Sequence, residues 1–185
     1  QKELSVGGKL DNTVIARLNG IYRLNGANGN FGDFAVVKSS NNTVSMFFKK
    51  NASFVIADAR LIQKEIILAG YWRFAQNETC GFIKLVIDSS NTKKILSNSN
   101  LSDLSFSGFY DFEGRKNIEF SFEKELKKEE FTIIGHRGGG RKSDRHPASE
   151  NSIEMIAYSE KLGANAIEID VQYTSDAIPI LFHDI

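Results

Sequence analysis

The sequence predicts two unlike parts, an antiparallel β-barrel or sandwich over residues 1–126 and the start of an α/β domain over residues 127–185. The first part contains no proline, and its short apolar runs are separated by clusters of Asn, Gly and Ser. The second part follows a run of charged residues and combines apolar strand-like segments with one amphipathic helix. Many short strands between turns are typical of antiparallel sheets, whereas strand, helix and strand in succession indicate a parallel βαβ unit.

Eight segments of the first part have the composition of strands. Alternation is clearest at 117–123, where Ile118, Phe120 and Phe122 alternate with polar residues, so one face is expected to be buried. The expected strands lie at 17–24, 33–38, 43–49, 53–57, 65–74, 81–88, 104–112 and 117–123. With no helical pattern between them, these segments predict a barrel or a sandwich.

The aromatic residues of this part have two interpretations. Aromatic side chains usually form the core of a small β domain. Alternatively, Tyr71, Trp72 and Tyr110 line the opening of a barrel that binds a sugar or a lipid. Glycine followed by two apolar residues recurs within the strands, at Gly20-Ile21-Tyr22, Gly70-Tyr71-Trp72 and Gly108-Phe109-Tyr110. Each glycine either permits a bend in the barrel wall or belongs to a ligand-binding barrel, and the sequence leaves both open.

Composition excludes several classes of protein. Lys and Arg number 23, as do Asp and Glu, so no net charge attracts the chain to nucleic acid. No apolar run approaches the roughly 20 residues of a membrane helix. A single cysteine, Cys80, excludes an internal disulfide and a cysteine zinc site. The chain starts at Gln1 and not at Met, so we expect that it has been trimmed, and we expect an extracytoplasmic location, periplasmic or secreted.

The second part is expected to begin with a buried strand at 131–134, which runs into a glycine-rich turn. A helix is expected after Glu150, with Ser149 or Asn151 as its N-cap and Gly163 as its stop. The apolar residues of this helix fall on two sides, so we expect neighbouring elements to cover both. The next expected strand is 166–171, which completes a βαβ unit.

Two acidic residues stand in that strand. Glu168 and Asp170 are two residues apart, so alternation places their side chains on the same face. Two neighbouring buried carboxylates repel each other, and a divalent cation between them relieves the repulsion. Oxygen ligands suit Mg²⁺ or Ca²⁺. The alternative is an exposed strand edge on which both acids are solvated.

Two histidines each follow an apolar run. His136 follows the expected first strand, and His183 follows the run at 178–182. Only twelve residues separate Asp170 from His183, which is short for a helical crossover. A hairpin centred between residues 176 and 177 would place Asp170 directly opposite His183, and a parallel connection without a helix would also bring both to one rim. Because each histidine adjoins Arg or Asp, the pattern favours acid–base chemistry over a structural role.

The order and spacing of these motifs resemble the start of a glycerophosphodiester phosphodiesterase domain. The motifs are His-Arg-Gly at 136–138, Glu-Asn-Ser at 150–152, Gly-Ala-Asn-Ala-Ile-Glu-Ile-Asp-Val at 163–171, Thr-Ser-Asp at 174–176 and Ile-Leu-Phe-His-Asp at 180–184. Three features depart from the family pattern. The loop before Glu150 is long and basic, with Arg141, Lys142 and Arg145, Ser152 replaces a threonine, and Ala177 replaces a glycine.

The resemblance implies a (β/α)₈ TIM barrel with its site at the carboxyl ends of the strands. It also implies metal-dependent hydrolysis of glycerophosphodiesters to glycerol phosphate and an alcohol. The implied roles are acid and base for His136 and His183, phosphate binding for Arg137, Ca²⁺ or Mg²⁺ ligands for Glu168 and Asp170, and support for Glu150 and Asp184.

A (β/α)₈ barrel needs about 250 residues, and only three of its strands are expected here. We therefore expect the 185-residue chain to be an incomplete and inactive piece of a phosphodiesterase, with an open sheet edge that permits self-association. The alternative function is a non-catalytic carbohydrate- or lipid-binding module formed by residues 1–126.

Overall fold

The structure is a computed structural model that describes residues 7–77, 79–127, 132–140 and 146–184. The chain divides into two compact units, residues 1–126 and residues 127–185. Each unit is described by itself below.

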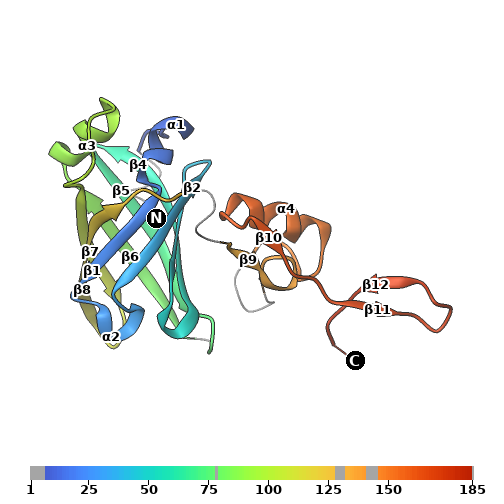
Figure 1. The fold of residues 1–185 in the computed structure, drawn as a ribbon. Helices are drawn as coiled ribbons and strands as arrows, with labels where there is room; N and C mark the ends of the chain where they lie inside the picture. Colours follow the sequence, from blue (N-terminus) through green and yellow to red (C-terminus); the bar gives the residue numbers. More distant parts are fainter. Residues whose placement is uncertain (1–6, 78, 128–131, 141–145, 185) are drawn as a thin grey trace. The chain divides into compact units, whose positions relative to one another are not determined.

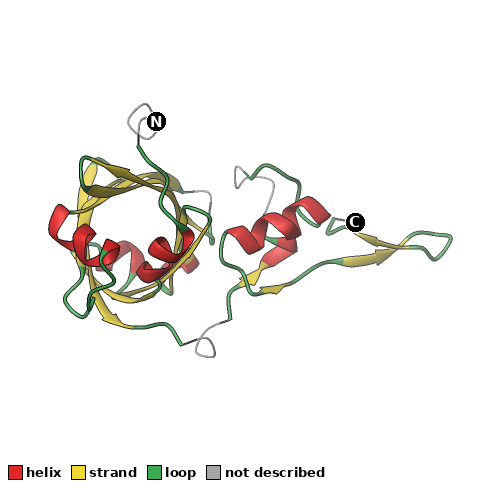
Figure 2. Ribbon diagram, turned by 90° about the horizontal axis from the view of Figure 1, so that it is seen from above, coloured by secondary structure: helices red, strands yellow, loops and turns green. Residues whose placement is uncertain are grey.

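The first unit is a closed barrel of eight antiparallel strands, each paired with its neighbour in sequence (Figure 1). Pairing of the first strand with the last, as at Leu24 and Phe120, closes the ring that Figure 2 shows from above. Closure excludes the sandwich alternative. The strands are β1 Gly20–Asn25, β2 Phe34–Ser40, β3 Thr43–Phe48, β4 Ser53–Ile62, β5 Glu65–Phe74, β6 Cys80–Ile87, β7 Ser105–Asp111 and β8 Arg115–Lys124.

Short turns and helices connect these strands. Asn41 and Asn42 link β2 to β3, and Gln63 and Lys64 link β4 to β5, in each case with positive φ at both residues. Two-residue turns of this kind match the twist of antiparallel strands, and Asn tolerates their backbone conformation well. The helices of this unit are α1 Asn12–Ile15, η1 Ala16–Leu18, α2 Asn28–Phe31, η2 Lys50–Ala52 and α3 Ser89–Leu96.

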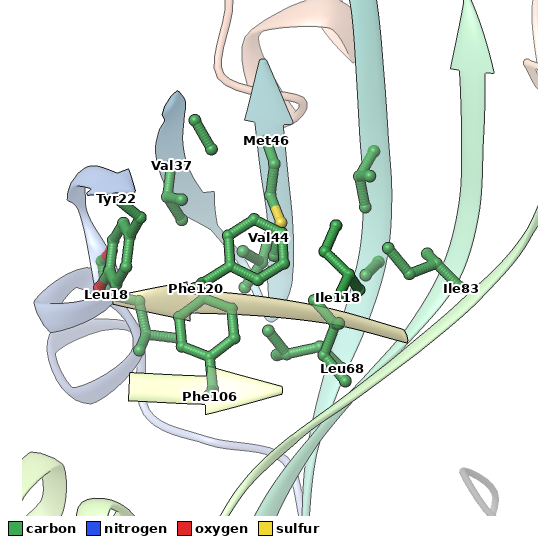
Figure 3. Close-up of a cluster of buried hydrophobic side chains, with 14 of the residues drawn as sticks. Leu18, Tyr22, Val37, Val44, Met46, Leu68, Ile83, Phe106, Ile118 and Phe120 are labelled. Atoms are coloured by element: carbon green, nitrogen blue, oxygen red, sulfur yellow. The ribbon is translucent and has the colours of Figure 1, made fainter. Parts of the chain in front are cut away.

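Apolar side chains fill the interior of the barrel (Figure 3). Trp72 and Tyr110 are fully buried, and both rings pack against Phe31 of α2. Tyr71, next to Trp72 in β5, lies on the other side of the strand against Phe54. The three aromatic residues considered for a binding opening therefore do not share one face, and Trp72 and Tyr110 belong to the core.

Two of the recurring glycines allow neighbouring strands to approach closely. A Cβ at Gly70 would lie 2.7 Å from the Cα of Ala57 in β4, and a Cβ at Gly108 would lie 2.8 Å from the Cα of Leu85 in β6. Both distances are shorter than side chains tolerate, and the obstructing atoms are backbone. The glycines are therefore needed by the wall of the barrel itself.

We expect Gly70→Ala to lower the free energy of unfolding of the barrel by about 1–3 kcal/mol, because β4 must move to admit the methyl group. Chemical denaturation followed by circular dichroism measures the loss. Gly29→Ala is the matched control, since a Cβ at Gly29 in α2 would meet no atom within 4 Å. Equal stability of Gly70→Ala and the wild type would contradict the role given to this glycine.

The described residues of the second unit form two small separate sheets and one α-helix of nine residues. β9 pairs in parallel with β10, and β11 pairs antiparallel with β12. The elements are β9 Ile134–Gly135, η3 His136–Gly138, α4 Ile153–Lys161, β10 Ala166–Ile167, β11 Val171–Tyr173 and β12 Pro179–Leu181. Among the described residues, no helix is long and apolar enough to cross a membrane.

The predicted fold class, a barrel or sandwich followed by the start of a (β/α)₈ TIM barrel, is wrong. The only barrel among the described residues is the closed antiparallel one, and the strands of the second unit do not join in one parallel sheet. The strand expected at 166–171 ends at Ile167, because the following backbone bonds elsewhere. The Gly138 N–H donates to the Glu168 carbonyl, and the Asp170 N–H donates to the Asn151 side chain.

Helix α4 also differs from the prediction. Ser152 is its N-cap, with a side chain that accepts from the Met155 N–H, in place of Ser149 or Asn151. Met155 and Ser159 are buried, but Ile153 is 79% exposed, so the described residues cover only one side of the helix. Gly163 ends the helix as expected, with a φ of 101° that glycine adopts without strain.

Candidate active site

The turn after β9 is held against Glu168 by hydrogen bonds. The backbone N–H of Arg137 donates to Glu168 Oε2 at 2.9 Å, and the N–H of Gly138 donates to the Glu168 carbonyl at 2.8 Å. In return, the Glu168 N–H donates to the Gly135 carbonyl at 3.0 Å. These bonds follow directly after the β9–β10 pairing and fix the Glu168 carboxylate next to the His136–Gly138 turn.

The guanidinium of Arg137 lies at the centre of the site. Nη1 donates to Glu150 Oε1 at 3.1 Å, and Nη2 contacts His183 Nε2 at 2.7 Å. Nε is buried and has no hydrogen-bond partner among the described residues. An unsatisfied buried donor is costly, and it indicates a position for an acceptor. The side chains of Arg137 and Glu150 are 16% and 22% exposed, so water screens this ion pair only in part.

The contacts of His183 determine which ring nitrogen carries the proton. An arginine side chain can only donate, so His183 Nε2 accepts from Arg137 with its lone pair. Nδ1 lies 2.8 Å from Asp184 Oδ1, and it must therefore carry the hydrogen and donate it. The hydrogen bond from His183 lowers the pKa of the Asp184 carboxyl, so this acid is ionised in neutral solution. His183 therefore carries its hydrogen on Nδ1 and directs its Nε2 lone pair at Arg137.

His136 lies on the exposed side of the same turn. Its side chain is 63% exposed, and its Nε2 lies 3.9 Å from Glu168 Oε2. This separation is too long for a hydrogen bond. An accessible ring of this kind is free to reach a ligand.

Asp170 is linked to the rest of the site through Asn151. Asn151 Nδ2 donates to Asp170 Oδ2 at 2.9 Å, and Asn151 Oδ1 accepts from the Asp170 N–H at 3.2 Å. The backbone N–H of Asn151 also donates to the Arg137 carbonyl at 2.7 Å. Sequence reasoning gave Asn151 only a capping role. The sequence signal for a larger role was its place next to Glu150, at the start of the helix. An amide there can form hydrogen bonds to two segments at once.

Two oxygen donors fit the predicted divalent cation, but the described residues bring together no group of three metal-binding side chains. Oδ1 of Asp170 and Oε1 of Glu168 have no hydrogen-bond partner among the described residues, so each carboxylate retains a free oxygen. Mg²⁺ is commonly held by one or two carboxylates, with substrate phosphate and water as its other ligands. The donor chemistry therefore fits, and the remaining ligands would come from elsewhere.

The hairpin that carries His183 differs from the prediction by one residue. Val171 pairs with Leu181, and the Phe182 N–H donates to the Asp170 carbonyl, so Asp170 faces Phe182 and not His183. The reason is the loop, which has three residues between Thr174 and Ile178 in place of two. Such a loop ends in a residue with positive φ, and Ala177 has a φ of 63°.

We expect Ala177→Gly to stabilise this hairpin by about 0.5–1 kcal/mol. The substitution removes the strain of a left-handed alanine, and the greater freedom of the unfolded glycine offsets part of the gain. Amide exchange of the Thr174 N–H, which donates to the Ile178 carbonyl at 3.0 Å, measures the effect. Ser175→Gly is the control, since Ser175 has no positive φ and gains nothing; slower exchange in that variant would argue against this explanation.

The structure thus connects all seven predicted site residues in one network. Arg137 contacts Glu150, Glu168 and His183, and the other members are reached through these residues and Asn151. The basic residues of the long loop, Arg141, Lys142 and Arg145, lie outside the described residues.

Comparison with known proteins covers this same segment. The model of the glycerophosphoryl diester phosphodiesterase family matches residues 136–185. Residues 136–185 are therefore similar to the glycerophosphoryl diester phosphodiesterase family. The match includes every residue of the network and excludes the barrel.

Curated proteins are also similar to this chain over a segment of 55–60 residues. Glycerophosphodiester phosphodiesterase 1 of Homo sapiens is 40% identical over 57 residues, which are 31% of this chain and 16% of the human protein. A glycerophosphocholine phosphodiesterase of Eremothecium gossypii is 40% identical over 55 residues, 28% of this chain and 4% of that protein. A chloroplastic glycerophosphodiester phosphodiesterase of Arabidopsis thaliana is 40% identical over 60 residues, 29% of this chain and 17% of that protein. The match thus spans about a sixth or less of these relatives, and no solved structure matches the chain.

Proposed function

We propose that the whole protein hydrolyses glycerophosphodiesters to glycerol phosphate and an alcohol, with the phosphodiesterase segment supplying its acid, its base and its phosphate-binding arginine. The observation that carries this proposal is the burial and the incomplete hydrogen bonding of the Arg137 guanidinium. Its guanidinium is largely buried, and one donor, Nε, lacks an acceptor among the described residues. A phosphate oxygen is the acceptor that an arginine edge binds best, because two parallel N–H groups match two anionic oxygens.

Phosphate binding would also activate His183. Nε and Nη2 lie along one edge of the guanidinium, and His183 Nε2 now occupies the Nη2 donor. An anionic substrate that takes this edge displaces the imidazole, and the Nε2 lone pair of His183 is then free to take a proton from the attacking water molecule. Asp184 keeps the proton on Nδ1 and stabilises the imidazolium that forms.

His136 would supply the second proton transfer. Its Nε2 lies 3.9 Å from a Glu168 carboxylate oxygen, and its exposure leaves the ring accessible to the leaving oxygen. We assign His136 as the acid that protonates the departing oxygen and His183 as the base. The two histidines differ in burial and partners, which is the asymmetry that an acid–base pair requires.

Glu168 and Asp170 are the proposed ligands of a Ca²⁺ or Mg²⁺ ion. A bound cation would neutralise charge on the phosphodiester during attack. Glu168 receives an N–H from Arg137, and Asp170 receives one from Asn151, so both carboxylates are oriented while one oxygen of each stays free. Because two carboxylates leave the cation short of protein ligands, we propose that residues 1–185 alone are inactive.

Hydrolysis of sn-glycero-3-phosphocholine across a series of Mg²⁺ and Ca²⁺ concentrations tests the proposal. The whole protein should show cation-dependent release of glycerol phosphate, and His136→Ala should lose at least about 100-fold in rate. Lys161→Ala, which removes an exposed charge from α4 of the same unit, is the matched control and should retain full activity. Absence of cation-dependent hydrolysis of any phosphodiester would overturn the assignment, and activity of residues 1–185 alone would overturn the proposed incompleteness.

No observation favours the alternative of a sugar- or lipid-binding module over catalysis, since buried aliphatic and aromatic side chains fill the barrel interior. The extracytoplasmic location and self-association through a sheet edge stay predictions.

A further inference from the structure

The strongest unassigned feature is Asn151. This residue is 7% exposed, and its three hydrogen bonds link Arg137 to Asp170. The backbone N–H donates to Arg137, and the amide bonds both the carboxylate and the backbone of Asp170. We propose that Asn151 is a positioning residue that orients Asp170 for a divalent cation, an inference that rests on the proposed function.

The amide of Asn151 is suited to this task because its donor and its acceptor both bond the same residue, Asp170. Nδ2 donates to Asp170 Oδ2 at 2.9 Å, while Oδ1 accepts the Asp170 N–H at 3.2 Å. Two bonds at fixed separation determine the rotation of the carboxylate as well as its place. Asp170 Oδ2 is thereby satisfied, and Oδ1 is left without a partner among the described residues. That free oxygen is the one that Asn151 presents to a cation.

The backbone of Asn151 is fixed as well. Its φ is 56°, and Arg137, whose carbonyl accepts the Asn151 N–H at 2.7 Å, has a φ of 55°. Asn occupies this left-handed region more readily than most side chains. Asn151 therefore links the turn that contains Arg137 to the proposed cation ligand Asp170. A movement of the turn would then be resisted by the bonds to Asp170.

Burial makes these bonds hard to replace. Asn151 is buried and its bonds to Asp170 are part-buried, so a side chain that cannot form them leaves Asp170 Oδ2 and the Asp170 N–H with reduced access to a replacement partner. An aspartate at 151 keeps the shape but sets a second carboxylate against Asp170. A glycine at 151 keeps the positive φ and removes the amide. The two substitutions therefore separate the backbone role from the side-chain role.

The test compares Asn151→Gly, Asn151→Asp and Asp170→Asn by two measurements on the whole protein. The first is amide hydrogen exchange of Asp170, which needs neither cation nor substrate. Asn151→Gly should accelerate exchange of the Asp170 N–H at least tenfold. The Gly138 N–H, which donates to the Glu168 carbonyl, should keep its rate and serves as the internal control.

The second measurement is Mn²⁺ binding by electron paramagnetic resonance. Both Asn151 variants should weaken binding by about 10–100-fold, the usual range for residues that orient a metal ligand. Because the proposed effect passes through Asp170, adding Asn151→Gly to Asp170→Asn should weaken binding less than twofold further. An additive double variant would overturn the inference.

The outcomes separate this inference from the proposed function. Unchanged exchange of Asp170 in Asn151→Gly overturns the positioning role even where hydrolysis is robust. Faster exchange with unchanged Mn²⁺ affinity assigns Asn151 to folding alone and also overturns it. A wild-type protein that binds no Mn²⁺ removes the cation from the proposed function, and the inference then fails with it.

Discussion

Trp72→Ala is expected to lower the free energy of unfolding of the barrel by about 3–5 kcal/mol. Trp72 is fully buried, and its ring packs against four other aromatic rings, those of Phe31, Phe74, Tyr110 and Phe112. Removing the indole leaves a cavity that these rings cannot fill without moving. Nε1 of Trp72 has no hydrogen-bond partner among the described residues, so the whole loss comes from packing. Denaturant unfolding followed by far-ultraviolet circular dichroism measures it.

Tyr71→Ala is the matched control, because Tyr71 is the next residue of β5 and lies on the opposite side of the strand. We expect the Tyr71 variant to lose less than half as much stability as the Trp72 variant. Equal losses would mean that the outer aromatic pair with Phe54 matters as much as the core, which would contradict the distinction between the two faces of the barrel.

Arg137→Lys is expected to reduce kcat/KM for sn-glycero-3-phosphocholine by about 10²–10³-fold in the whole protein. Lysine keeps the positive charge but has no planar edge with two parallel donors. It cannot keep the bond to Glu150 and at the same time offer a planar pair of donors to a phosphate, as arginine can. Steady-state hydrolysis at saturating Mg²⁺ measures the loss.

Circular dichroism and amide exchange should show that the Arg137 variant stays folded, since Arg137 also donates its backbone N–H to Glu168 and lysine retains that donor. The exposed Lys161→Ala substitution should leave kcat/KM within twofold of the wild type. A decrease of less than tenfold in the Arg137 variant would indicate that charge alone is sufficient at this position, and would remove the bidentate role.

The strands of the barrel were predictable because alternation is a local property. Each of the eight expected segments overlaps one observed strand, and β5 agrees residue for residue with the expected range 65–74. Closure of the ring was not predictable, because it depends on the register between β1 and β8, which no local pattern records. The second unit misled the prediction for a related reason, since 166–171 alternates as a strand does while the backbone after Ile167 bonds to the turn at 135–138 and to Asn151.

The members of the candidate site were predictable from residue types at strand ends, but their contacts were not. Sequence spacing placed Asp170 opposite His183, and the three-residue loop moved the pairing by one position. The direct contact of Arg137 with His183 joins residues 46 apart, and no spacing rule predicts it. The bonds of Asn151 to Asp170 were not predicted, because an asparagine at the start of a helix is usually interpreted as an N-cap.

The sequence contains a single tryptophan, and it lies in the barrel core. Its emission should be that of a water-excluded indole in the folded protein, and it should shift to longer wavelength only when the barrel opens. Fluorescence excited at the red edge of protein absorption, where only tryptophan absorbs, therefore reports on the first unit and not on the second. Unfolding of the second unit can then be followed separately by amide exchange, without division of the chain.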